Sequence, residues 1–418
     1  MCGIIALHAP RGAVSPSALR AGSHALLHRG PDGTGAWISA DRRIGLAHTR
    51  LAIIDLATGQ QPLASDDGAL HLAVNGEFYG YEAIRDELRG RGRVFRTSTD
   101  AEIVLHLYDE RGAECLDRLR GDFAFVLWDD RNKRLLAARD RFGVKPLFYA
   151  VHDGILSRAS EVKALLASGM PAAWDREQVY QLITLGVPVP DRSLFKGVGQ
   201  VPPGHYLLAT DRDIRLVRYW DLDYPSADRQ RARTDDDERA FVERFGAALD
   251  EAVRTRLRAD VPVACYLSGG LDSSAVLGLA ARHIGQPLAA FTVAFDGEDL
   301  DESHVAAETA RKAGADWHPV RIGQRELAEN FEVAAWHSEM AFRNAHGVAL
   351  FVLSERVRRA GYKVVLTGQG AERGPGWVRN VPGATCAVDA LVDTAAHGAC
   401  PTPSGPPRCG LRRGVRPA

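Results

Sequence analysis

Residues 261–274 read Val-Pro-Val-Ala-Cys-Tyr-Leu-Ser-Gly-Gly-Leu-Asp-Ser-Ser, and this stretch decides the fold of the C-terminal half. A short apolar run ends at Leu267, two glycines follow, and a helical pattern begins near residue 273. A strand that turns through glycines into a helix aims main-chain N–H groups and a helix N-terminus at an anion. The stretch lacks the Gly-Lys-Ser/Thr ending of a Walker A loop, so transfer of a γ-phosphoryl group is not indicated.

The segments around this stretch repeat the same alternation. Apolar strand patterns at 288–295, 317–320 and 364–367 alternate with helical patterns, after a long helical pattern at 238–258. Such alternation predicts an α/β fold with a doubly wound parallel sheet, whose ligands bind beyond the carboxyl ends of the strands. The loops at 268–274, 293–295 and 367–370 all belong to that edge.

The N-terminal half has a different pattern. Short strand patterns at 4–7, 44–48, 70–74, 123–128 and 134–138 follow one another with few crossover helices. Helical patterns lie at 16–27, with Ser15 as cap and Pro16 in the first position, and at 81–90 and 100–111. The pattern predicts an α+β layer of antiparallel sheets with helices to about residue 205.

Cys2 is the candidate nucleophile of this half. If Met1 is removed, Cys2 carries both a thiol and a free α-amine, so one residue supplies nucleophile and general base. An α-amine with a pKa of about 7.7–8 can accept the thiol proton and return it to a leaving group. Taken alone, Met-Cys-Gly is equally typical of an ordinary N-terminus.

Three polar positions have two interpretations each. Arg50 precedes an apolar run to Ile54 that reads as one continuous strand, where it is either a solvated flank or a fork for a small carboxylate. Asn75-Gly76 is either a hairpin tip or a pair of oxyanion donors. Asp100 is either a helix N-cap or a partner for a ligand ammonium.

Six ordered motifs give these positions a common meaning. Cys2-Gly3, HRGPDG at 28–33, RLAIID at 50–55, NGEFYG at 75–80, the Asp100 region and RDRFGVKPLFY at 139–149 resemble class II glutamine amidotransferase domains, which have the N-terminal-nucleophile (Ntn) fold. The resemblance implies that Cys2 attacks the glutamine carboxamide while Asn75 and Gly76 hold the oxyanion. It assigns Arg50 to the glutamine α-carboxylate, and Asp100 with the Glu77 segment to the α-amine. The implied glutamine-binding residues are Arg50, Leu51, Ala52, Ile53, Ile54, Asn75, Gly76, Glu77 and Asp100.

Ser268–Ser274 resembles the SGGxDS pyrophosphate loop of enzymes that cleave ATP between the α and β phosphates. Together the halves resemble glutamine-hydrolysing asparagine synthetase, which implies that glutamine, aspartate and ATP are substrates and that Mg²⁺ is a cofactor. Aspartate would form β-aspartyl-AMP, and ammonia freed at Cys2 would travel inside the protein and displace AMP. Asp272 is the uncertain metal candidate. The implied ATP-binding residues are Leu267, Ser268, Gly269, Gly270, Asp272, Ser273, Ser274, Val293, Thr367 and Gly368.

The C-terminal end departs from this pattern. The family continues with an Asp-Glu pair where this chain has Glu372-Arg373. Residues 373–418 hold seven Gly, seven Pro and three Cys without a sustained period, which indicates disorder. We expect a chain truncated or frame-shifted near codon 372, with a natural variable tail as the alternative. The predicted domains are 2–205 (amidotransferase), 206–238 (linker), 239–372 (partial ATP-binding domain) and 373–418 (tail).

Composition sets the remaining expectations. Of 418 residues, 45% are hydrophobic and 25% are charged, and the net charge of −1 argues against a nucleic-acid binder. No signal peptide or membrane span is recognised, so a cytoplasmic protein is expected, and a homodimer is usual in the family. Two alternatives to asparagine synthesis stay open: an amide-forming ligase for another carboxylic acid in a biosynthetic pathway, and a glutaminase without synthetase activity.

Overall fold

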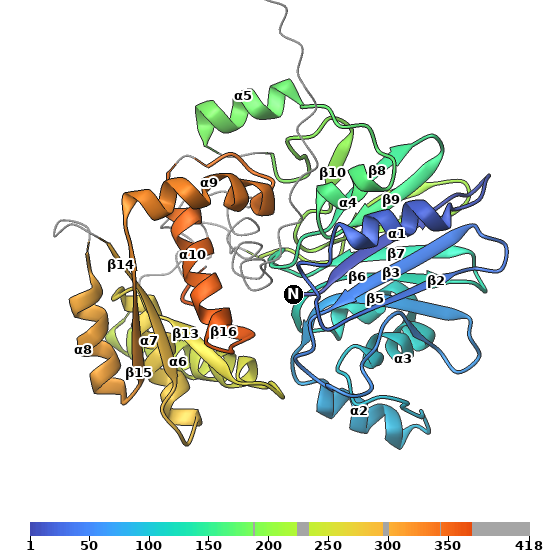
Figure 1. Ribbon diagram of the computed structural model, residues 1–418. Coiled ribbons are helices and arrows are strands. Elements are labelled where there is room, and N and C mark those ends of the chain that lie inside the picture. Colours follow the sequence, from blue (N-terminus) through green and yellow to red (C-terminus); the bar gives the residue numbers. More distant parts are fainter. Residues whose placement is uncertain (187–188, 224–233, 296–300, 343, 370–418) are drawn as a thin grey trace, which may run out of the picture.

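The computed structural model describes residues 1–186, 189–223, 234–295, 301–342 and 344–369. In the described residues two antiparallel six-stranded sheets form the N-terminal part, and one parallel four-stranded sheet forms the C-terminal part, as predicted (Figure 1). Glu372-Arg373 and the tail 373–418 lie outside the described residues.

The first antiparallel sheet holds the N-terminus of the chain. Its strands run in the order β10-β8-β9-β1-β3-β2, and each pairing is antiparallel. Their bounds are β1 (Gly3–His8), β2 (Gly33–Ile38), β3 (Ile44–Arg50), β8 (Phe148–His152), β9 (Ile155–Ala159) and β10 (Val198–Gln200).

The second antiparallel sheet runs in the order β12-β11-β7-β6-β5-β4. Its strands are β4 (Leu63–Ala64), β5 (Leu70–Phe78), β6 (Gly121–Asp129), β7 (Arg134–Arg139), β11 (His205–Ala209) and β12 (Ile214–Arg218). Apolar residues from both sheets, among them Ile4, Leu46 and Val126, form one core between them.

Helices cover the outer faces of this pair of sheets. α1 (Pro16–His24) and α4 (Val162–Ala167) pack on the first sheet. α2 (Tyr81–Gly90), α3 (Glu102–Arg111) and the 3₁₀-helix η1 (Gly112–Asp117) accompany the second. Ser15 caps α1 by accepting the N–H of Ala18, as predicted. α5 (Arg176–Leu185) lies apart from both sheets in Figure 1.

The structure differs from the predicted linker at 206–238. Strands β11 and β12 occupy its first part, and β11 pairs with β7 along Tyr206–Ala209. Leu207 is buried in the core between the sheets, so this strand belongs to the N-terminal part. The Asp- and Arg-rich surroundings hide the short apolar alternation in the sequence. Residues 224–233 lie outside the described residues.

The parallel sheet runs in the order β15-β14-β13-β16. Its strands are β13 (Val263–Tyr266), β14 (Ala289–Phe295), β15 (Asp316–Ile322) and β16 (Val364–Leu366). One face carries α6 (Asp235–Arg256), α7 (Leu271–His283) and α8 (Ser303–Ala313), and the other carries α9 (Gln324–Ser338) and α10 (His346–Arg359). Helices on both faces are what a doubly wound sheet requires.

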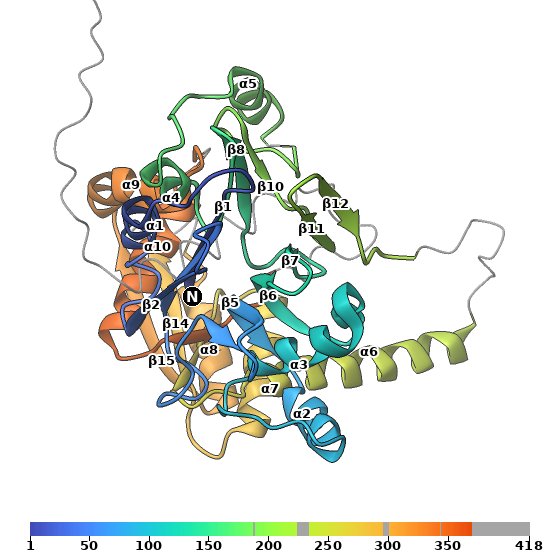
Figure 2. The same ribbon diagram turned by 90° about the vertical axis from the view of Figure 1, so that its right-hand side faces the viewer.

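The two parts meet beside the start of the chain (Figures 1 and 2). The contact also reaches the second sheet and α2, where Arg256 pairs with Asp122 and Arg258 pairs with Glu82. Lys363 forms an ion pair of 2.8 Å with Asp32, and the N–H of Asp55 donates to the Asp260 carboxylate at 2.8 Å. The N–H of Asp260 donates in return to the carbonyl of Ile53 at 2.9 Å. No helix in the described part of the chain has the length and apolar content that crossing a membrane demands.

Candidate active sites

Cys2 lies immediately before β1, half-buried against the end of β3. Its Sγ is 3.4 Å from the N–H nitrogen of Leu51 and 3.7 Å from the Leu51 carbonyl oxygen. The Nε–H of Arg29 donates to the Cys2 carbonyl at 2.9 Å. Burial raises the pKa of the Cys2 thiol, although the chain's amino group opposes the shift. The thiol therefore needs a base to become a nucleophile near neutral pH.

Gly3 fixes the start of β1 because no larger residue fits there. A Cβ at this position would lie 2.5 Å from Thr49 Oγ1 and 2.7 Å from Leu26 Cβ. The N–H of Gly3 donates to the same Thr49 hydroxyl at 3.1 Å. This close packing of β1 on β3 holds Cys2 at the end of β3.

Asn75 and Gly76 lie inside β5, opposite Ala124 and Phe123 of β6, so the hairpin-tip interpretation is wrong. The Asn75 side chain is fully buried, and both of its amide atoms lack a hydrogen-bond partner in the described residues. Gly76 has a φ of 148°, and a Cβ there would lie 2.2 Å from the Asp122 carbonyl oxygen. A buried amide without a partner is costly, so it indicates a site that awaits a ligand.

Arg50 ends β3 and is only 4% exposed, so it is not a solvated flank. Its guanidinium donates to the carbonyls of Ile54, Asp55 and Leu56. No carboxylate of the described residues lies within ion-pairing distance of the Arg50 guanidinium. Within that part of the chain, this buried cation is therefore held by main-chain oxygens alone. The predicted strand over 50–54 is wrong: the chain leaves the sheet after Arg50, and Asp55 has a φ of 54°.

Asp100 and Glu77 form an acidic pair beside β5. The Asp100 carboxylate accepts the N–H of Phe78 at 2.7 Å and the hydroxyl of Thr99 at 3.1 Å, whereas the cap position of α3 belongs to Ala101. Burial raises the pKa of Asp100 to about 6. Burial and the neighbouring Asp100 charge raise the pKa of Glu77 to about 7. Two carboxyls with raised pKa values suit an incoming ammonium group.

Two N-terminal motifs serve as scaffold. Asp140 accepts the N–H groups of Phe142, Val144 and Lys145, each at 3.0 Å, which shapes the loop after β7. Asp32 accepts the N–H of Ala52 at 2.8 Å and so fixes the loop after Arg50. Cys2 and the loop from Arg50 to Ile54 are thereby brought together by direct contacts, with Leu51 touching the sulfur.

The predicted ATP loop lies at the carboxyl end of β13. Gly269 has a φ of 82°, Gly270 precedes α7, and the hydroxyls of Ser268 and Ser273 lie 3.0 Å apart. The Ser273 hydroxyl also donates to the Gly270 carbonyl at 3.1 Å. Ser268, Gly270 and Leu271 are exposed, so the loop is open to a ligand.

The order of the parallel strands explains why this loop is a binding position. β14 and β15 lie on one side of β13 and β16 lies on the other, so the direction of winding reverses between β13 and β16. Thr367 and Gly368 follow β16 at that point, and a Cβ on Gly368 would lie 2.7 Å from the Ser273 nitrogen. Val293 lies near the end of β14, at the same edge of the sheet.

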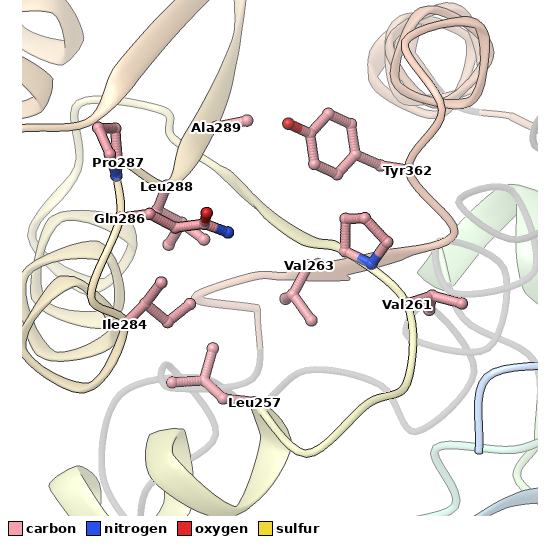
Figure 3. Close-up of a pocket in the computed structure, with 10 residues that line it drawn as sticks. Leu257, Val261, Val263, Ile284, Gln286, Pro287, Leu288, Ala289 and Tyr362 are labelled. Carbon is pink, nitrogen blue, oxygen red and sulfur yellow. The ribbon is translucent and has the colours of Figure 1, made fainter. Parts of the chain in front are cut away.

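A separate cavity lies at the opposite edge of the parallel sheet (Figure 3). It measures about 190 Å³ and is lined mainly by apolar residues at the starts of β13 and β14 and by Tyr362 before β16. Because ligands of such sheets bind beyond the strand carboxyl ends, this cavity is not the candidate nucleotide site.

The described residues contain no group of three or more His, Cys, Asp and Glu side chains that could hold a metal ion. Asp272, at the start of α7, is the one carboxylate within the loop 268–274. These residues alone do not form a metal centre.

Sequence reasoning missed several residues that support the Cys2 site. Glu161 and Lys163 lie more than 130 positions after Arg29, and Glu339 lies more than 170 positions further on, yet together they join the Arg29 side chain to the second part of the molecule. Arg29 and Asp32 lie within a recognised motif, which was the available signal. Asp260, Lys163 and Glu339 carry no local pattern.

The layered antiparallel sheets and the cysteine immediately before β1 agree with the glutamine amidotransferase class that the sequence predicts. Residues 1–220 match the family model described as glutamine amidotransferase domain. The chain therefore belongs to that family. Residues 244–373 match the model described as asparagine synthase.

Individual relatives extend this result. The chain is 40% identical over 367 residues to "Amidase chry2" of Gibberella zeae, a match that covers 83% of this chain and 53% of the relative. It is 36% identical over 395 residues to "Putative asparagine synthetase [glutamine-hydrolyzing]" of Mycobacterium tuberculosis, covering 89% and 59%. The chain thus spans little more than half the length of these curated relatives. A solved glutamine phosphoribosylpyrophosphate amidotransferase of B. subtilis is 17% identical, with a TM-score of 0.42 and coverage of 76% and 81%.

Proposed function

We propose that this protein hydrolyses glutamine at Cys2 and delivers the ammonia to a carboxylic acid that the second part activates with ATP. The observation that carries the first half is the fully buried Asn75 amide, which has no hydrogen-bond partner in the described residues and lies beside Gly76. The second half is supported by the loop Ser268–Ser274, in which Ser268, Gly270 and Leu271 are exposed, at the point where the winding of the parallel sheet reverses.

The proposed glutaminase reaction uses Cys2, which immediately precedes β1, and two residues of β5. After removal of Met1, the α-amine of Cys2 takes the thiol proton, and the thiolate attacks the side-chain carbonyl carbon of glutamine. The Asn75 Nδ2–H and the Gly76 N–H would donate to the oxyanion. The ammonium form of the amine returns its proton to the leaving nitrogen, ammonia departs, and water then hydrolyses the thioester to glutamate.

Substrate binding is assigned to the charged groups around this centre. Arg50 would hold the glutamine α-carboxylate, and Asp100 with Glu77 would hold its α-ammonium. Leu51, Ala52, Ile53 and Ile54 would line the substrate. The opposite charges at the two ends of the site match an amino acid in its zwitterionic form.

In the second part, ATP would lie on the loop Ser268–Ser274 with Leu267, Val293, Thr367 and Gly368 around it. Attack of the acceptor carboxylate on the α-phosphorus would release pyrophosphate, and ammonia would then displace AMP to form the amide. Mg²⁺ is proposed only as the companion of ATP, with Asp272 as candidate ligand. We assign no step to it, because the described residues form no metal centre.

Aspartate is the first candidate acceptor, by the likeness to proteins named asparagine synthetase. A different carboxylic acid is the second candidate, because relatives at 40% and 41% identity are named amidases. A glutaminase without synthetase activity is the third outcome to be tested. A homodimer stays a prediction.

The test measures pyrophosphate release from Mg-ATP and each acceptor acid, with ammonium supplied so that Cys2 is bypassed. Pyrophosphate and asparagine with aspartate support the first candidate, and turnover with another acid alone supports the second. Glutamine hydrolysis without pyrophosphate would leave only the glutaminase. The matched control is Cys2→Ala, which should lose glutamine-driven turnover and keep the ammonium-driven reaction. Loss of both would contradict the division of labour.

A further inference from the structure

A buried cluster of charges joins the Cys2 site to the end of α9. Arg29 and Glu161, from the N-terminal part, form an ion pair of 2.6 Å, and both side chains are nearly inaccessible. Arg29 binds Oε1 of this carboxylate, whereas Oε2 lies 2.9 Å from the His28 ring and 2.6 Å from Lys163 Nζ. Since Arg29 also donates to the Cys2 carbonyl, the cluster touches the nucleophile's own main chain.

The second part completes this cluster with Glu339. This residue follows α9 in the left-handed conformation, with a φ of 55°, and its side chain is 9% exposed. Its two carboxylate oxygens accept the N–H groups of Val162 and Lys163, each at 2.6 Å. They therefore satisfy the first turn of α4, whose own cap residue Glu161 makes no side-chain cap hydrogen bond. Lys163 Nζ also lies 3.1 Å from Glu339 Oε1.

The charges in the cluster balance only when Glu339 is present. Arg29 and Lys163 are two cations, and Glu161 is the one carboxylate that the N-terminal part supplies to them. Burial lowers the pKa of His28 below its ordinary value, so His28 is counted as neutral. Burial alone would raise the pKa of Glu161, but His28, Lys163 and Arg29 hold that pKa well below its usual range. Burial lowers the pKa of His337 to about 3, so this neighbour of His28 stays neutral. Without Glu339, one buried carboxylate would be shared by two cations.

We infer that Glu339 is a positioning residue for the glutaminase centre. Glu339 shares Lys163 with Glu161, so Glu161 can hold Lys163 through Oε2 and Arg29 through Oε1 at the same time. Arg29 in turn holds the carbonyl of Cys2. The second part of the molecule thus sets the geometry of the nucleophile in the first. The inference rests on the proposed glutaminase function of Cys2.

The first variant removes the charge and keeps the shape. In Glu339→Gln, Lys163 loses its second partner and draws Glu161 away from Arg29, so we expect kcat/KM for glutamine to fall by roughly tenfold to 100-fold. Glu329→Gln is the matched control, because Glu329 lies on α9, the helix that Glu339 follows, is exposed and pairs locally with Arg325. It should behave as the unmodified chain does.

The second variant restores the balance of charge. Lys163→Met with Glu339→Gln leaves one cation, Arg29, and one carboxylate, Glu161. We expect this double variant to recover most of the lost kcat/KM, and to exceed both single variants. A role of Glu339 in folding alone would instead make the double variant as poor as the worse single variant or poorer, which would overturn the inference.

A third readout does not need glutamine turnover. The rate at which iodoacetamide alkylates Cys2, followed on the N-terminal peptide by mass spectrometry against pH, reports the thiol directly. We expect a shifted pH profile in Glu339→Gln and a restored one in the double variant. Full glutamine hydrolysis with an unshifted profile in Glu339→Gln would refute the coupling. If the unmodified chain fails to hydrolyse glutamine while the profile still shifts, the proposed function fails and the coupling stands.

Discussion

At the scale of single residues, the Cys2 site combines a buried cation without a carboxylate partner in the described residues and a buried amide without any partner there. Arg50 is bound by three main-chain carbonyls, which orient its fork without neutralising it. The Asn75 amide is likewise placed by its strand and left unbonded. Both arrangements cost free energy in the ligand-free protein, and bound glutamine would recover it.

Replacing Arg50 tests the proposed carboxylate contact. Arg50→Ala should raise KM for glutamine by about 10-fold to 100-fold, since a charge-assisted hydrogen-bond pair is lost. Arg50→Lys keeps the positive charge but loses the planar guanidinium, so its KM for glutamine should lie between those of the unmodified chain and of Arg50→Ala. Steady-state kinetics with glutamine, beside the same reaction driven by ammonium, provide the measurement. An unchanged KM for glutamine would reject the assignment, and a loss of the ammonium-driven rate would point to damage elsewhere.

The acidic pair predicts a pH dependence with a definite sign. The pKa of Glu77 is raised to about 7 and that of Asp100 to about 6, so both carboxyls become neutral as the pH falls through this window. A neutral carboxyl does not hold an ammonium, so KM for glutamine should rise as the pH falls below about 7. Raised carboxyl pKa values also mean that their ionisation costs folding stability as the pH rises, and bound ammonium offsets that cost.

The measurement is KM for glutamine at closely spaced pH values on either side of neutrality. In Glu77→Gln the change in KM for glutamine near pH 7 should disappear, and KM should be higher than in the unmodified chain at every pH. A KM in the unmodified chain that stays flat across this range would show that the pair does not bind the ammonium.

At the scale of elements, the close packing of Gly368, which follows β16, against the loop Ser268–Ser274 gives a test of the proposed ATP site. In Gly368→Ala the new Cβ would lie 2.7 Å from Ser273 N and 2.8 Å from the Asp272 carbonyl carbon, so the loop must shift. We expect ATP-dependent pyrophosphate release to fall by at least about tenfold while glutamine hydrolysis is unchanged. Gly278→Ala in α7 is the control, because a Cβ there meets nothing within 4 Å. Equal activity of the two variants would argue against this loop as the nucleotide site.

Local sequence patterns predicted the helices and strands wherever the spacing of apolar residues agrees with the residues that begin or end an element. The strand, glycine turn and helix around Ser268 are confirmed, and so are the antiparallel layers and the cap of α1. The run Leu51–Ile54 was misjudged because apolar residues buried in a loop have the same composition as those in a strand. Asn75-Gly76 follows the signature of a hairpin turn, yet long-range pairing with β6 overrides it. The segment 205–218 was missed because two short strands have charged neighbours.

The candidate site divides in the same way. The motifs named Cys2, Arg50, Asn75 and Asp100 directly, and in the structure Arg50, Asn75 and Asp100 are buried and Cys2 is half-buried. The roles themselves stay predictions. Glu339 and Asp260 could not be found, since their importance lies in contacts between residues more than 170 positions apart. Only the folded chain brings such residues together.

At the scale of the whole molecule, the loop that follows Arg50 is joined by hydrogen bonds to the second part. Asp260 accepts the N–H of Asp55 and donates its own N–H to Ile53, while Arg258 lowers the pKa of its carboxyl. Asp260→Ala should raise KM for glutamine by about twofold to fivefold, a small effect because the carboxylate is partly exposed. Asp250→Ala, which breaks only an ion pair with His283 inside the second part, is the control. Equal glutamine kinetics in both variants would contradict a role for this contact.

The contact that the Glu339 carboxylate makes between the two parts can be followed by hydrogen exchange. It binds the main-chain N–H groups of Val162 and Lys163, which no other group in the first turn of α4 would satisfy. Their exchange with deuterated solvent should therefore be slow only while the parts stay docked. Two amide protons in the first part thus report the opening of the whole molecule, with no substrate present.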